Sequence, residues 1–155
     1  MLVNEPYYYG SAENKLNSKG QVAIPARFRP TSTEEGERKN YVLVRGEGQC
    51  IYMYTHQRFA GVKDNVKHIA DETDDDGFYR TFMKEIQSVE LDTQGRFVLP
   101  QVLMKEVGIK GPSILFIGMD DRIEIWDPDV YERGSAASQH YEETRKKAAR
   151  KIFGI

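Results

Sequence analysis

The chain has 155 residues, 39% of them hydrophobic and 30% charged, which is enough apolar material for one ordinary core without covalent staples. Its formal net charge of −2 gives no support for nucleic-acid binding as a property of the whole chain, so such a function must come from local charge. The single cysteine, Cys50, excludes an internal disulfide and favours a reducing compartment.

The first predicted elements lie in and around KLNSKGQVAIPARFR, residues 15–29. Leu16 ends a short strand, and Asn-Ser-Lys-Gly after it predicts a turn, because asparagine can bond the backbone two residues on and glycine suits the fourth position. The run VAIP predicts a second strand that Pro25 ends, and Pro30 limits the following helix to about one turn. The stretch contains no acid and four bases, which are Lys15, Lys19, Arg27 and Arg29.

A β-hairpin is predicted for Val42–Tyr54, around the segment RGEGQ. Residues 63–87 then have a helical pattern, with four apolar side chains on one face: Phe78, Phe82, Met83 and Ile86. The acidic run Asp71–Gly77 admits a calcium-loop interpretation, but the twelfth position is methionine instead of glutamate, which favours a solvated loop.

The pattern of Leu16–Pro25 returns at Leu91–Pro100, LDTQGRFVLP, where leucine, glycine and proline coincide. A second block returns in the same order, because Ile114–Trp126 matches Val42–Tyr54. Two matched blocks in one order indicate an internal duplication. A unit of about 45 residues would bury too little surface alone, so we expect the two repeats to share one core around a pseudo-twofold axis.

The second repeat predicts a longer helix, QVLMKEVGI, that ends at Gly108. Asp127 is expected to cap a helix that begins at Pro128. A last helix is predicted for residues 138–153, with acids early and bases late, as the helix dipole favours. Its basic cluster, Arg145–Lys151, is interpreted either as a further DNA-binding arm or as an exposed helix end.

The doubled motif Leu-Asp-x-x-Gly-Arg, followed by three apolar residues and proline, resembles the MraZ family of bacterial regulators, which are built from two AbrB-like swapped-hairpin units. The segments IGMDDRIEIWD and YYYGSAENKLNSKGQVAIPARFR are also similar to that family. The resemblance implies an α+β fold, in which duplicated swapped-hairpin β units form one pseudo-twofold, β-barrel-like core with flanking helices. It places two SpoVT-AbrB domains at residues 11–57 and 88–131, joined by a helical connector, 58–87, and followed by a C-terminal helix, 138–153.

The same resemblance implies a sequence-specific, double-stranded-DNA-binding transcriptional regulator of the division and cell-wall gene cluster. It also implies a ring-like homo-oligomer, cytoplasmic and nucleoid-associated, on a promoter with repeated sites. We expect no enzyme activity, cofactor, metal site or membrane partner, because the sequence contains no nucleophile–base set, metal-ligand spacing, phosphate loop or long apolar run. The alternative is an oligomeric protein–protein interaction module with reduced or lost DNA binding.

One departure from the family pattern concerns the charged pair of the motif. The pattern Asp-x-x-x-Arg, whose arginine in the first repeat contacts DNA in the family, is present here only as Asp92 and Arg96. The first repeat has Asn17 and Gln21 instead, a pair that can still hydrogen-bond and hold the turn. Glutamine reads adenine edges where arginine prefers guanine, so we expect altered sequence preference or weaker affinity. Asp92–Arg96 is interpreted as a structural brace, with a catalytic or ligand pair and a secondary DNA contact as alternatives.

The two repeats also differ in charge. The stretch Glu90–Met104, which matches the four-base stretch of the first repeat, has two acids and only one base. A phosphate backbone would attract the first repeat and be nearly indifferent to the second. We therefore expect the second repeat to face other subunits and the first to face DNA, through Lys15, Asn17, Lys19, Gln21, Arg27 and Arg29.

Overall fold

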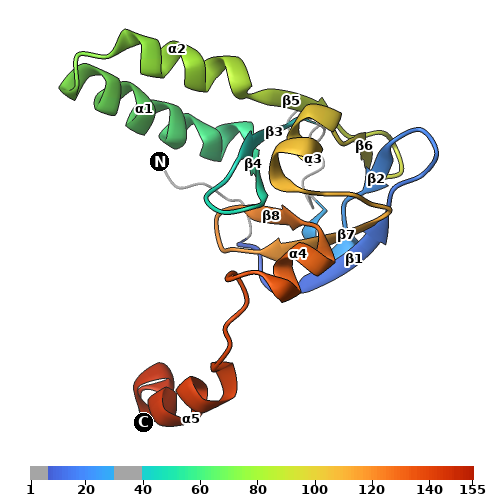
Figure 1. Ribbon diagram of the computed structural model, residues 1–155, viewed down its shortest axis with the longest axis vertical. Helices are drawn as coiled ribbons and strands as arrows, with labels where there is room; N and C mark the ends of the chain where they lie inside the picture. Colours follow the sequence, from blue (N-terminus) through green and yellow to red (C-terminus); the bar gives the residue numbers. More distant parts are fainter. Residues whose placement is uncertain (1–6, 30–39) are drawn as a thin grey trace.

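The computed structural model describes residues 7–29 and 40–155 (Figure 1). The first half contains β1 (Ser11–Lys15), β2 (Gln21–Ala23), the 3-10 turn η1 (Ala26–Phe28), β3 (Asn40–Arg45) and β4 (Ile51–Thr55). Two helices follow, α1 (His56–Glu72) and α2 (Asp76–Glu85). The second half contains β5 (Gln87–Glu90), β6 (Arg96–Val98), α3 (Gln101–Val107), β7 (Ser113–Gly118) and β8 (Ile123–Trp126). The chain ends with α4 (Pro128–Arg133) and α5 (Tyr141–Phe153).

The strands of the two halves are arranged symmetrically. Six strands form an antiparallel sheet in the order β1-β7-β8-β4-β3-β5, and β2 pairs with β6 in a separate two-stranded ribbon. The order of the sheet reads the same from either end when β1 is exchanged with β5, β7 with β3 and β8 with β4. The mixed α+β class is therefore confirmed. Within the described residues β1 and β5 remain as free edges of the sheet, so the strands do not close into one barrel.

The register of the β2–β6 ribbon shows how closely the halves correspond. Val22 and Phe97, which occupy matched places in the sequence repeat, are paired directly with each other. The backbone N–H of Ile24 donates to the carbonyl of Gly95 at 2.8 Å, and its counterpart, the N–H of Leu99, donates to Gly20 at 3.1 Å. Hydrogen bonds of the same kind therefore hold both ends of the ribbon.

Both halves contribute to one hydrophobic core, as the sequence predicted. Six matched side chains are 1% exposed or less: Val22, Ile24, Ile51, Phe97, Leu99 and Ile123. Burying a side chain of this size stabilises the fold by roughly 1.5–3 kcal/mol. Cys50 is also fully buried, and burial raises the pKa of its thiol to about 12, so it acts as a small apolar side chain.

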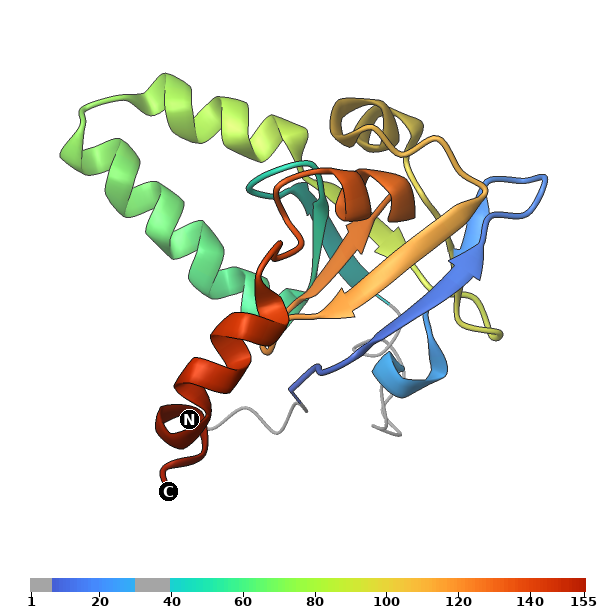
Figure 2. The same cartoon turned by 60° about the horizontal axis from the view of Figure 1, so that its bottom comes forward.

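The helices α1 and α2 form a hairpin that extends from the sheet (Figures 1 and 2). Near the sheet, Phe59 of α1 packs with Val42, Val44 and Tyr54. The sequence predicted helix over residues 63–87 without a break, and this is wrong in detail: α1 already begins at His56, and a turn separates it from α2. That turn forms because the side chain of Asp75 accepts the N–H of Phe78 at 3.0 Å and starts a new helix.

Two predicted helix boundaries are confirmed by their caps. Gly108 follows α3 in the left-handed conformation, with φ of 79°, which a residue with a side chain rarely adopts. The side chain of Asp127 accepts the N–H groups of Asp129 and Val130 at 2.9 and 3.3 Å, and α4 begins there. Among the helices that the structure describes, none combines the length and apolar character needed to cross a membrane.

Candidate nucleic-acid interface

The two turns of the repeat have the same hydrogen-bond pattern. In the first turn, Oδ1 of Asn17 accepts the backbone N–H groups of Lys19 and Gln21, each at 2.9 Å. In the second, Oδ1 of Asp92 accepts those of Gln94 and Arg96, also at 2.9 Å. The fourth residues, Gly20 and Gly95, have φ of 76° and 77°, as the predicted glycine preference requires.

The side chains across the two turns differ in charge. Asn17 donates through Nδ2 to Oε1 of Gln21 at 3.0 Å, which confirms the predicted neutral pair. In the second turn, Nε of Arg96 donates to Oδ2 of Asp92 at 2.9 Å. The backbone N–H of Arg96 and then its guanidinium hold the pKa of the Asp92 carboxyl below its ordinary value, although partial desolvation opposes this. The charged pair therefore braces its turn while Arg96 stays partly exposed.

One face of the β2–β6 ribbon carries side chains from both repeats. Gln21 is paired with Val98, and Ala23 is paired with Arg96, so these four side chains share a face opposite the buried pair at the centre of the ribbon. The exposed fraction of Val98 is 56%, so this apolar side chain lies on the surface. We call this face, formed by Gln21, Ala23, Arg96 and Val98, the ribbon face.

The four bases of the first repeat do not form a single cluster. Lys15 and Lys19 are exposed beside the first turn, which projects from the body in Figure 2. Nε of Arg29 donates to the carbonyl of Ile24 at 3.1 Å, and a methyl group on Gly95 would lie 2.8 Å from that Nε, so Arg29 lies at the second turn. Positive side chains therefore lie at both ends of the ribbon face.

Arg27 lies elsewhere. Its guanidinium contacts Gly10, which precedes β1, whereas the first turn follows the other end of that strand. Lys15 also has an acidic neighbour on its own strand, because Glu13 is exposed on the same side of β1. The four bases of the first repeat therefore do not form one uniformly cationic surface.

Sequence reasoning missed Val98 as a surface residue. The run FVLP predicts a short apolar strand, like VAIP in the first repeat, without distinguishing its two faces. The period of two along a strand is the signal that could have identified it, because burial of Phe97 and Leu99 leaves Val98 on the opposite face.

The other candidate sites of the sequence do not assemble. Within residues 7–29 and 40–155, no three histidine, cysteine or acidic side chains converge as metal ligands would. The acidic run Asp71–Gly77 is divided between the end of α1, a turn and the start of α2, with its acids exposed. The basic cluster Arg145–Lys151 lies on α5 and is exposed except for its two alanines.

These observations define an α+β protein in which two equivalent strand–turn–strand units meet in one ribbon with a partly polar, partly apolar outer face. A family model described as "MraZ protein, putative antitoxin-like" matches residues 82–153. A protein named transcriptional regulator MraZ in Cytophaga hutchinsonii is 30% identical over 128 residues, covering 82% of this chain and 83% of that protein. Proteins of the same name in Caldanaerobacter subterraneus subsp. tengcongensis and Clostridium tetani are 32% and 30% identical, over 83% and 90% of this chain and 87% and 95% of their own lengths. The chain belongs to the MraZ family.

Proposed function

We propose that this protein is a transcriptional regulator that binds double-stranded DNA in a sequence-specific manner. Relatives that align over most of both chains are named transcriptional regulators, not enzymes. The observation that carries the proposal is the ribbon face, on which Gln21 and Arg96 lie together with positive side chains at both ends. A two-stranded antiparallel ribbon is one of the structures that the major groove of B-DNA admits.

The ribbon face offers two kinds of DNA contact. Lys15, Lys19 and Arg29 would pair with phosphates, which fixes the position of the protein without reading sequence. Gln21 suits the N6 and N7 edge of adenine, and Arg96 suits the O6 and N7 edge of guanine. The apolar Val98 offers a contact to the methyl group of thymine. In this proposal the second repeat reaches DNA as well as the first.

The number of phosphate contacts favours a homo-oligomer. About three contacts per protomer give a salt dependence with a slope of only about −3 on logarithmic axes, which corresponds to weak binding. Several protomers on repeated sites would multiply the affinity through avidity. We therefore propose a ring-like homo-oligomer, cytoplasmic and nucleoid-associated, at the promoter of the division and cell-wall gene cluster.

The symmetric strand order supports a finer proposal for the fold. We infer that residues 11–57 and 88–131 are tandem SpoVT-AbrB domains with swapped hairpins, since β1 pairs with β7 of the other half and β5 pairs with β3. Residues 58–87 are the helical connector in this description, and residues 138–153 contain the C-terminal helix.

A second candidate function is an oligomeric protein–protein interaction module. The neutral Asn17–Gln21 pair favours it, because the first repeat lacks the arginine expected for DNA contact.

One binding experiment distinguishes the two functions. The affinity for a labelled duplex from the region upstream of the gene is measured at several salt concentrations. We expect tighter binding than to a shuffled duplex, and a slope that increases with the number of bound protomers. Equal binding to both duplexes would contradict sequence-specific regulation and favour the interaction module.

A further inference from the structure

The C-terminal helix α5 has no buried residue. It stands away from the sheet in Figures 1 and 2, after a connection formed by residues 134–140. The apolar side chains Tyr141, Ile152 and Phe153 are 57%, 57% and 58% exposed, and the spacing of Tyr141, Ala148 and Ile152 puts them on one side of the helix. An amphipathic helix gains most of its stability by packing such a side against a partner.

The helix α5 is also strongly basic. Residues 141–153 contain five bases and two acids, which gives a net charge of +3. Arg145 lies four residues after Tyr141 and Lys151 lies three residues after Ala148, so these two exposed bases flank the apolar side of the helix. Lys147 is paired with Glu143 at 3.1 Å, whereas no ion pair engages Arg145 or Lys151 within the described residues. The partner of α5 should therefore be acidic beside an apolar strip.

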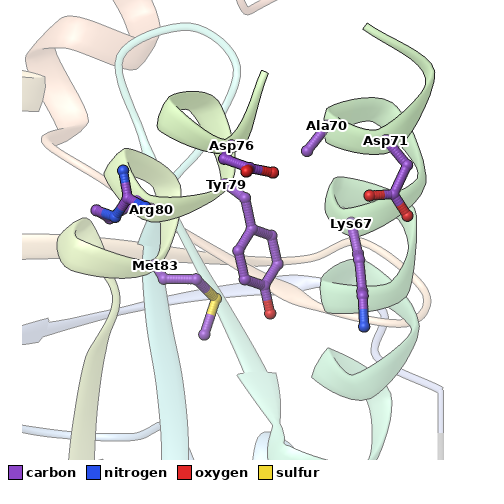
Figure 3. Close-up of a pocket in the computed structure, with 7 residues that line it drawn as sticks. All are labelled: Lys67, Ala70, Asp71, Asp76, Tyr79, Arg80 and Met83. Carbon is purple, nitrogen blue, oxygen red and sulfur yellow. The ribbon is translucent and has the colours of Figure 1, made fainter. Parts of the chain in front are cut away.

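The α1–α2 hairpin provides a surface of that kind. A cleft of about 490 Å³ between the two helices is lined by Lys67, Ala70, Asp71, Asp76, Tyr79, Arg80 and Met83. Figure 3 shows the Tyr79 ring and the Met83 side chain toward one end of the cleft and the carboxylates of Asp71 and Asp76 on opposite walls. Ile69 and Phe78 are 47% and 40% exposed on the same hairpin.

The tip of this hairpin is strongly acidic. Residues 71–76 hold five carboxylates and no base, and all of them are exposed. This charge repels a phosphate backbone or an anionic membrane surface and attracts a basic helix. The hairpin and α5 project from different parts of the molecule in both views, so contact between them is most direct between two protomers.

We propose that α5 of one protomer docks in the α1–α2 cleft of a second protomer. The apolar side of α5 would cover Tyr79 and Met83. The two bases that flank this side, Arg145 and Lys151, would face the acids of the hairpin tip, which are Asp71, Glu72 and Asp76. The contact joins two different surfaces, so it repeats from protomer to protomer and produces a closed ring or an open chain. The inference rests on the homo-oligomer of the proposed function and gives it a specific contact.

Charge reversal on each surface tests the contact. One variant carries Arg145→Glu and Lys151→Glu, and the other carries Asp71→Lys, Glu72→Lys and Asp76→Lys. Each alone should repel its partner surface, and light scattering after size exclusion should show a mass well below that of the parent oligomer. An equimolar mixture should restore the parent mass, because alternating protomers again present opposite charges at every contact. Circular dichroism checks that both variants remain folded.

A control with the same charge change lies on another surface. Lys105 and Lys110 are exposed and lie outside α5 and the α1–α2 hairpin. A variant with Lys105→Glu and Lys110→Glu should therefore keep the mass of the parent oligomer. A monomeric parent, reversed variants that keep the parent mass, or a mixture that fails to recover it would each overturn the proposal. Masses are measured without DNA, so a failure of DNA binding leaves this result unaffected.

A cross-linking measurement remains decisive if a reversed variant does not fold. Ala148→Cys and Met83→Cys, introduced together, should form disulfide-linked multimers with diamide as the oxidant, while the buried Cys50 stays unreactive. The single variants serve as controls and should give no multimers beyond dimers. Only monomers from the double variant would contradict the contact. So would loss of DNA or anionic-vesicle binding in Arg145→Glu with Lys151→Glu at an unchanged mass, because α5 would then bind a different partner.

Discussion

Val22 and Phe97 hold the same place in the two sequence repeats and face each other in the β2–β6 ribbon, where each is 1% exposed. The pseudo-twofold axis of the strand pairing therefore passes between these two side chains. The ribbon joins the halves of the chain, and its inner side is part of their common core while its outer side is the ribbon face. Stability and the proposed recognition surface consequently depend on the same six residues of backbone.

The first prediction concerns the buried side of this ribbon. Phe97→Ala should lower the free energy of unfolding by about 3–5 kcal/mol, because it removes a buried aromatic ring and leaves a cavity. Val98→Ala, one residue further along and on the exposed side, should change it by no more than about 0.5 kcal/mol. Urea unfolding monitored by circular dichroism measures both. Equal effects at the two positions would show that the ribbon does not have one buried and one exposed side.

The second prediction concerns the pH dependence of stability at the second turn. The pKa of Asp92 is lowered in the folded protein, so its carboxylate stabilises the fold above the unfolded pKa of about 3.9, and this stabilisation is lost as pH falls through the folded value. Asp92→Asn keeps an oxygen acceptor for the two backbone N–H groups but removes the charge. The parent should therefore be more stable than Asp92→Asn at pH 7, and the difference should shrink below pH 4.

Urea unfolding between pH 3 and pH 7 measures this difference. Asp64→Asn, which removes an exposed carboxylate from α1, is a suitable control and should show little pH-dependent difference from the parent. A difference between parent and Asp92→Asn that stays constant across this range would rule out a contribution from ionisation of Asp92.

Local elements of the fold were predictable because their causes lie in short sequence patterns. Gly20 and Gly95 end turns whose first residue is Asn or Asp, and Asp127 caps a helix that begins with proline. The direct pairing of β2 with β6 was not predicted, since pairing between distant strands depends on the whole fold and not on local preference. The break between α1 and α2 was missed because helical periodicity continues on both sides of Asp75.

The candidate site was predicted in composition but not in arrangement. Arg27 and Arg29 are only two residues apart, yet the first contacts Gly10 and the second lies at Gly95. Arg27 belongs to the turn η1, whereas Arg29 follows it in extended conformation, so their side chains leave the chain in different directions. The sequence shows the bases but contains no local signal for this divergence.

The third prediction uses this divergence. Lys19→Ala should reduce the slope of logarithmic affinity against logarithmic salt by about 0.9 for each phosphate that the lysine neutralises, and it should weaken binding to all sequences alike. Arg27→Ala removes the same charge away from the ribbon face and should leave the slope close to that of the parent. Fluorescence anisotropy with a labelled duplex at several salt concentrations measures both. If both substitutions reduced the slope equally, Arg27 would also contact DNA phosphates. If Lys19→Ala left the slope unchanged, Lys19 would not contact them.

The last prediction concerns base preference at the first turn. Asn17→Asp with Gln21→Arg leaves the net charge unchanged and gives the first repeat the charged pair that braces the second turn. Because arginine favours guanine where glutamine favours adenine, the double variant should gain about tenfold in preference for guanine at one position per half-site. Competition between duplexes that differ at single positions measures this preference. Gln94→Arg, which adds a base to the second turn instead, should strengthen binding to every duplex without changing their ranking. An unchanged ranking in the double variant would show that residue 21 does not contact a base.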